Sequence, residues 1–129
     1  MSASIVRLAR SSVVHVLFAF VAMGGWAVFA NRTHPMPAPP VAGMIQGGLS
    51  ACITLFLKRL IETLSLRFDG IGALLVPPGI TCLVSASLLT LIHALSGTPE
   101  ILATIALPLT VATSYAALYS FSLWKAGRR

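Results

Sequence analysis

Four long stretches of this sequence carry almost no charge, and this constrains the fold more than any other feature. Val13 to Ala30 is a run of 18 residues without Lys, Arg, Asp or Glu. A helix needs about 20 mostly apolar residues to cross the hydrocarbon of a bilayer. Similar stretches occupy residues 41–58, 77–95 and 100–123. The sequence therefore predicts an all-α membrane protein in which four transmembrane helices form a compact bundle.

The composition supports the same prediction. The chain has 129 residues, of which 57% are hydrophobic and only 9% are charged. Soluble domains carry roughly 25% charged residues, so the deficit is too large for a surface that faces water. A chain of this length favours one domain. We therefore expect residues 1–129 to form a single integral membrane domain.

The basic residues predict how the chain is oriented. Cytoplasmic loops of membrane proteins are enriched in Lys and Arg. In the predicted topology only Arg32 lies on one side, and eight of the nine basic residues lie on the other: Arg7, Arg10, Lys58, Arg59, Arg67, Lys125, Arg128 and Arg129. Both termini are therefore expected in the cytoplasm, most simply across a bacterial inner membrane. The basic residues form no stripe interleaved with aromatics, which argues against a nucleic-acid partner.

The stretch from Val41 to Leu66 has two different faces. At the helical period, its small and polar residues fall within roughly 160° of one another. The opposite side carries Ile45, Leu49, Ile53, Phe56 and Leu60. Small residues let helices approach closely in lipid, so Gly43, Gly47 and Ala51 predict a packing seam, within the chain or across a dimer. The polar residues of this face form a candidate path or polar contact: Gln46, Ser50, Thr54, Lys58 and Glu62.

Gln46 is the most polar side chain expected inside the hydrocarbon. Its amide is costly to bury without partners. One interpretation is that it bonds a hydroxyl of the third or fourth helix and holds the helices together. The alternative is that Gln46 lines a path for a transported substrate. Lys58 and Glu62 are four residues apart and are expected to pair near the membrane interface.

His34, His93 and Glu100 are expected on the side opposite the basic residues. Three titratable groups near one surface form a candidate outer polar cluster, but their spacing matches no metal signature. The sequence contains no Ser/His/Asp order, paired carboxylates or phosphate-binding glycine loop. We therefore expect no metal, no cofactor and no enzyme, although a membrane enzyme using His93 and Glu100 is a third alternative. Cys52 and Cys82 are expected to be free and buried.

The first apolar stretch has a rival interpretation as a signal peptide. Arg7 and Arg10 precede it, and small residues stand near Ala30. The run is longer than the usual ~7–15 residues of the apolar core (h-region) of a signal peptide, so we expect it to be retained as a span. Residues 31–40 then form a proline-rich loop. Asn31-Arg32-Thr33 matches the glycosylation pattern, which we attribute to chance.

Local signals predict where the later helices begin and end. Pro77 and Pro78 favour the first turn of the third helix, where the missing N–H has no partner anyway. Gly97 is expected to end that helix, and Thr98 to cap the fourth. Pro108 should kink the fourth helix.

By architecture alone, the chain resembles small multidrug exporters, small fluoride channels and small proteins thought to help move lipid-linked sugars. The acidic residue in the first span of the exporters is missing from Val13 to Ala30, and the motifs of the fluoride channels are absent. We assign the chain to none of these families. The sequence favours a non-enzymatic accessory or assembly subunit in a homo-oligomer or larger membrane assembly, with lipid-linked or amphipathic molecules as the candidate substrates. The alternative is a homodimeric transporter or channel.

Overall fold

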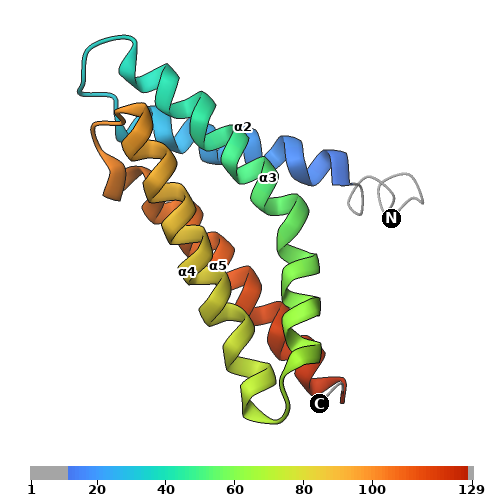
Figure 1. Cartoon of the computed structure of the whole chain (residues 1–129). Helices are drawn as coiled ribbons and strands as arrows, with labels where there is room; N and C mark the ends of the chain where they lie inside the picture. Colours follow the sequence, from blue (N-terminus) through green and yellow to red (C-terminus); the bar gives the residue numbers. More distant parts are fainter. Residues whose placement is uncertain (1–11, 128–129) are drawn as a thin grey trace, which may run out of the picture.

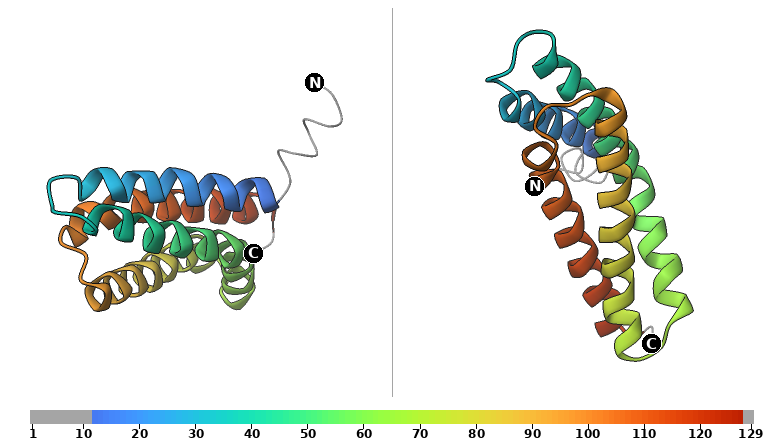
Figure 2. Two further views of the ribbon diagram at one scale, coloured as in Figure 1. Left: turned by 90° about the horizontal axis from the view of Figure 1, so that it is seen from above. Right: turned by 60° about the vertical axis from the view of Figure 1, so that its left-hand side comes forward.

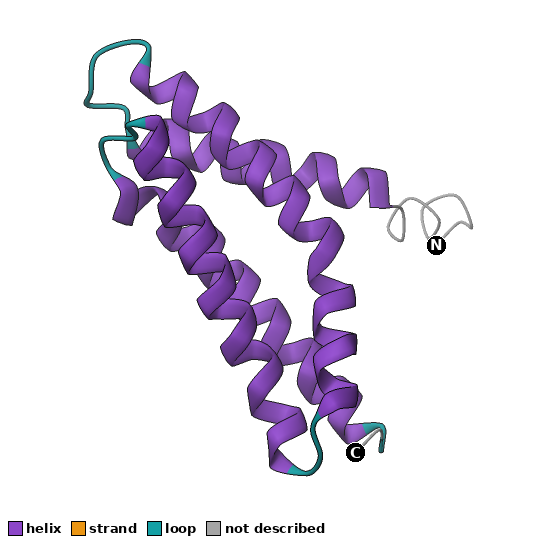
Figure 3. Ribbon diagram, in the orientation of Figure 1, coloured by secondary structure: helices purple, strands orange, loops and turns teal. Residues whose placement is uncertain are grey.

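The computed structural model describes residues 12–127, and all the regular secondary structure in that range is helical. Its four helices are α2 (Ser12–Ala30), α3 (Ala38–Arg67), α4 (Ile71–Ser96) and α5 (Ile101–Lys125) (Figure 3). All four are long and apolar enough to cross a membrane. Arg7, Arg10, Arg128 and Arg129, on which the orientation partly depends, lie outside the described residues.

The helices form a bundle with two distinct ends (Figure 1). The loops between α2 and α3 and between α4 and α5 lie together at one end, which we call the two-loop end. The turn between α3 and α4 lies near the end of α5 at the other, the turn end, where the indole N–H of Trp124 donates to Gly70 O at 3.1 Å. Within the described residues α2 contacts α3 and α5 but not α4. Figure 2 shows the same arrangement from two further sides.

The first half of α3 packs against α2 through glycines. A Cβ atom built on Gly24 of α2 would lie 2.9 Å from Gly43 O, and one built on Gly47 would lie 3.0 Å from Phe20 O. A Cβ on Gly43 would meet a methyl of Val28 at 2.5 Å. The structure therefore places Gly43 and Gly47 against α2 of the same chain, whereas Ala51 is only partly buried.

The second half of α3 packs against α5 through larger side chains. Leu57 and Ile61 form a cluster with Ala116 and Leu123, and Ile53 packs at its edge. Leu57 and Ile61 continue the helix face that carries Gln46 and Ser50. The face is therefore small and polar near α2, and bulky and apolar where it meets α5.

The third helix begins at Ile71, six residues before the predicted start at Pro77. Pro77 and Pro78 lie inside α4, so the carbonyls four residues earlier, on Ala73 and Leu74, lose their helical donors. The hydroxyl of Ser120 on α5 lies 3.1 Å from Ala73 O and 2.9 Å from Leu74 O. A hydroxyl from the neighbouring helix, shared between the two carbonyls, therefore compensates in part for the missing N–H groups, which helps to explain why the prolines are tolerated in the interior.

Ser120→Ala is expected to destabilise the bundle by about 1–3 kcal/mol, because a buried carbonyl and a partly buried one would lose their shared donor. Thermal unfolding of the purified protein in detergent measures the effect. Ser122→Ala is the matched control, since Ser122 is exposed on the same helix. Equal stabilities of the two variants would show that Ser120 does not compensate for the prolines.

The connection between α4 and α5 differs from the prediction at Thr98. Gly97 ends α4 in the left-handed conformation with φ 74°, as predicted. Thr98 does not cap α5, whose N-cap residue is Glu100. The Thr98 N–H donates to His93 O at 3.0 Å, and its hydroxyl contacts His93 instead of the backbone of α5. Thr98 therefore closes the end of α4.

Candidate functional site

A buried polar contact joins α3 to α4. Gln46 and His93 are each 0% exposed, and His93 Nε2 lies 2.8 Å from Gln46 Oε1. Gln46 Nε2 donates to the Ser50 hydroxyl at 2.8 Å, one turn further along α3. On the other side of the imidazole, His93 Nδ1 lies 2.7 Å from Thr98 Oγ1. Thr98, His93, Gln46 and Ser50 form a continuous chain, which we call the buried polar chain.

The donors and acceptors of this chain follow from its geometry. The side-chain carbonyl of Gln46 can only accept, so His93 Nε2 carries a hydrogen and donates it. In the neutral imidazole Nδ1 is then an acceptor, and the Thr98 hydroxyl donates to it. All the hydrogen bonds consequently run in one direction, from Thr98 through His93 and Gln46 to Ser50. Such an arrangement satisfies both ring nitrogens of a fully buried histidine.

A second set of hydrogen bonds at the two-loop end centres on Asn31. Its side-chain N–H group donates to Ala27 O at 2.8 Å and to Thr104 Oγ1 at 2.7 Å. Its side-chain oxygen accepts the backbone N–H of Glu100 at 3.0 Å. Asn31 is 0% exposed. It therefore joins the end of α2 to the start of α5, and its burial agrees with a chance match to the glycosylation pattern.

The predicted outer cluster separates into two parts. His34 Nε2 lies 2.7 Å from Glu100 Oε2, so these residues form a partly exposed pair between the two loops. His93 belongs instead to the buried polar chain, where it contacts Gln46 and Thr98. The structure thus links His93 to a residue that the sequence assigned to a different candidate site.

The part of the predicted polar face nearer the turn end does not join the buried polar chain. Lys58 Nζ lies 3.7 Å from Glu62 Oε2, and their side chains are 64% and 37% exposed. The Tyr119 hydroxyl of α5 also bonds the Glu62 carboxylate. Thr54 is partly buried, and in the sequence it lies between Ser50 and Lys58. The five residues of the candidate path are therefore divided into a buried pair, Gln46 and Ser50, and a partly exposed group nearer the turn end.

Sequence reasoning missed three residues of these networks: Asn31, Thr98 and Thr104. The sequence position of Asn31 does indicate such a role, since a side-chain amide directly after an apolar helix must find partners for its donors and acceptor. The prediction for Gln46 was wrong in one respect. Its partner on a neighbouring helix is the imidazole of His93 and not the expected hydroxyl. The cysteines are free, as expected, but Cys52 is exposed and Cys82 is only partly buried.

Within residues 12–127, no three His, Cys, Asp or Glu side chains gather where they could hold a metal. By the length and composition of its helices, the fold is that of a small multi-pass membrane protein. Comparisons of the chain with protein-family models, with curated proteins and with solved structures gave no match.

Proposed function

We propose that this chain is a non-enzymatic accessory or assembly subunit of a membrane complex, most simply in a bacterial inner membrane. The observation that carries the proposal is the bond between Gln46 and His93. A residue that lines a path for a substrate must offer its polar atoms to that substrate. Gln46 is fully buried, and both ends of its amide are already bonded within the chain. This supports a role in holding α3 to α4.

An accessory role can be tested by deleting the gene in its native host and measuring the abundance of all other membrane proteins. The expected result is that one or a few multi-pass proteins become scarce and recover when the wild-type chain is restored. Reconstitution provides the opposing test. If the other membrane proteins are unchanged and the purified chain alone carries a solute across vesicles, the accessory role is wrong. Lipid bound to the purified protein would indicate whether amphipathic molecules are handled.

A transporter is the second candidate function, and one observation favours it. The buried polar chain begins at Thr98, beside the α4–α5 loop, and leads through His93 and Gln46 to Ser50 inside the bundle. Polar residues inside a membrane domain can mark the path of a transported solute. No further hydrogen bond leads onward from Ser50 within the described residues, so the accessory role is the better supported of the two.

The proposed orientation places both termini in the cytoplasm. Reporter fusions at Pro37, Asp69, Gly97 and Arg129 are expected to read outside, inside, outside and inside, because the basic residues are concentrated on one side. A fusion at Arg129 that reports the outside would contradict the proposed topology.

A further inference from the structure

The charged residues of the described chain are divided unequally between the two ends of the bundle (Figure 1). The two-loop end carries Arg32 and Glu100, whose charges cancel. The turn end has more basic residues than acidic ones: Lys58, Arg59, Arg67 and Lys125 against Glu62 and Asp69. We propose that the turn end binds the headgroup of an anionic phospholipid through Arg59, Arg67 and Lys125, which we call the basic surface. The proposal rests on the helices crossing a membrane and is independent of the accessory role.

The cations of the basic surface are available to an anion from outside the chain. All three are exposed, and within residues 12–127 their side chains form no ion pair or hydrogen bond. Lys58, by contrast, is paired with Glu62. At the two-loop end the Arg32 guanidinium lies 3.8 Å from the centre of the Phe29 ring and donates to Phe29 O at 2.8 Å. Arg32 therefore has partners in its own chain that the basic surface lacks.

The packing of α5 against the α3–α4 turn gathers the basic surface at one end of the bundle. The indole N–H of Trp124 donates to Gly70 O, which holds the last turn of α5 against this turn (Figure 1). Arg67 lies in the last turn of α3 and Lys125 in the last turn of α5, so they flank the same contact. The helix dipole favours a cation at either helix end, but it does not account for Arg59, about two turns earlier on α3.

The length of α3 places the basic surface at the level of the lipid headgroups. A helix crosses the hydrocarbon with about 20 residues, whereas α3 has 30. Counted from Ala38, about 20 residues end near Leu57, so Arg59 and Arg67 belong to the part of α3 beyond the hydrocarbon. Long basic side chains at this depth extend their charged groups toward the phosphates.

Exposed apolar side chains beside these cations favour a lipid over a soluble anion or an acidic protein. On α3, Leu55, Arg59 and Leu66 fall within about 40° of one another at the helical period. Leu55 is 51% exposed and Leu66 is 66% exposed. Ile71, at the start of α4, is 62% exposed. A phospholipid can offer acyl chains to these side chains and a phosphate to the arginines, whereas a soluble anion would leave the apolar side chains in water.

The excess of positive charge favours a phospholipid with a net negative charge. Phosphatidylcholine and phosphatidylethanolamine carry a cationic group beside the phosphate, and the basic surface would repel that group. Phosphatidylglycerol carries the phosphate without a cation. A Lys or Arg near an anionic membrane surface contributes about fivefold to binding, so even one unpaired cation gives a measurable preference.

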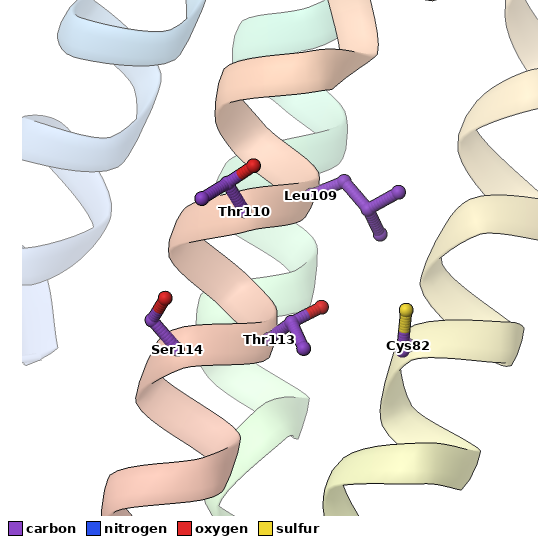
Figure 4. Close-up of a pocket in the computed structure, with 5 residues that line it drawn as sticks. All are labelled: Cys82, Leu109, Thr110, Thr113 and Ser114. Carbon is purple, nitrogen blue, oxygen red and sulfur yellow. The ribbon is translucent and has the colours of Figure 1, made fainter.

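The pocket between the middles of α4 and α5 provides a control, because it has no charged group to attract an anion. Its volume is about 310 Å³, and its lining residues are Cys82, Leu109, Thr110, Thr113 and Ser114. In Figure 4 the Thr113 side chain points from α5 toward α4, with Cys82 opposite. We therefore expect substitutions in this pocket to leave the lipid preference of the turn end unchanged.

Quenching of tryptophan fluorescence by brominated lipids tests the two ends separately. Of the two tryptophans, Trp124 lies at the turn end and Trp26 contacts Ala103 near the two-loop end. Vesicles contain phosphatidylglycerol and phosphatidylcholine, with one or the other lipid brominated. Trp26→Phe leaves the reporter at the turn end, where we expect phosphatidylglycerol to be preferred about fivefold or more. Trp124→Phe leaves the other reporter, for which we expect no preference. The same preference at both ends would contradict the proposal.

Removal of charge in the Trp26→Phe background tests the residues of the basic surface. Glutamine keeps a polar side chain without the charge, so Arg67→Gln should lower the preference, and the triple variant Arg59→Gln, Arg67→Gln and Lys125→Gln should remove it. Arg32→Gln and Thr110→Val are the controls and should behave like the parent. An unchanged preference in the triple variant would overturn the proposal.

Native mass spectrometry of the unaltered chain gives a second measurement that needs no tryptophan substitution. After reconstitution into vesicles of equal parts phosphatidylglycerol and phosphatidylethanolamine and mild extraction, phosphatidylglycerol should be the lipid that stays bound. Excess glycerol phosphate should not release it, because that anion lacks the acyl chains. Equal retention of the two lipids would contradict the proposal, and complete release by glycerol phosphate would show that the surface binds a soluble anion instead.

Discussion

Gly47→Ile should separate α2 from α3 and destabilise the protein by about 3 kcal/mol or more, at the upper end of the cost of overpacking. A Cβ atom at Gly47 would already lie 3.0 Å from Phe20 O and 3.1 Å from carbons of the Phe20 ring. Isoleucine adds further atoms beyond that position, and the backbone of α2 cannot move aside without losing its contact with α3. Thermal unfolding in detergent measures the loss.

The matched control for this variant is Gly48→Ile. Gly48 is the next residue of the same helix, and a Cβ built on it meets nothing within 4 Å. Both substitutions change helix propensity in the same way, so their difference reports the contact with α2. The same comparison is available on α2, where Gly24→Ala should destabilise the protein more than Gly25→Ala does. Equal effects within either pair would mean that glycine contacts do not hold α2 to α3.

Gln46→Leu should destabilise the protein by about 1–3 kcal/mol, because it leaves the ring N–H of His93 buried without an acceptor. The substitution also removes the donor to Ser50. Leucine has a similar length and suits a membrane helix, so the loss reports hydrogen bonding more than packing. The measurement is the yield of folded protein together with its unfolding temperature.

Glu100→Gln is a useful comparison for Gln46→Leu. His34 and Glu100 are paired but partly exposed, and exposed ion pairs contribute about 0–1 kcal/mol. We therefore expect a small loss of stability from Glu100→Gln and a larger one from Gln46→Leu. A larger loss of stability in Glu100→Gln would indicate that the pair of His34 and Glu100, and not the buried polar chain, contributes most to the stability of the two-loop end.

The four helices could be predicted from sequence because a bilayer sets the length and polarity of a spanning helix. Their ends were harder to place. Pro77 and Pro78 predicted the start of a helix, because the N–H groups that proline lacks have no helical partner in a first turn. This argument considers only the residues next to the prolines. The compensating hydroxyl belongs to Ser120, which is more than 40 residues away in the chain. No local pattern contains that information.

The candidate site could be predicted in part for a similar reason. The spacing of Gly43, Gln46, Gly47 and Ser50 places them on one face of one helix, which the sequence alone determines. The partner of each residue depends on which helices are neighbours. The sequence places Gln46 and His93 in separate candidate sites because they are 47 positions apart in the chain. Their contact follows from the antiparallel packing of α3 on α4, which composition and periodicity do not specify.

The most direct test of whether the polar face of α3 holds the bundle together is a double-mutant cycle on Gln46 and His93. Unfolding free energies are measured for Gln46→Leu, His93→Leu, the double variant and the wild type. If the side chains stabilise each other, the double variant should lose less than the sum of the single losses, with a coupling of about 1 kcal/mol. Strictly additive losses would contradict the role of the Gln46–His93 bond in joining α3 to α4.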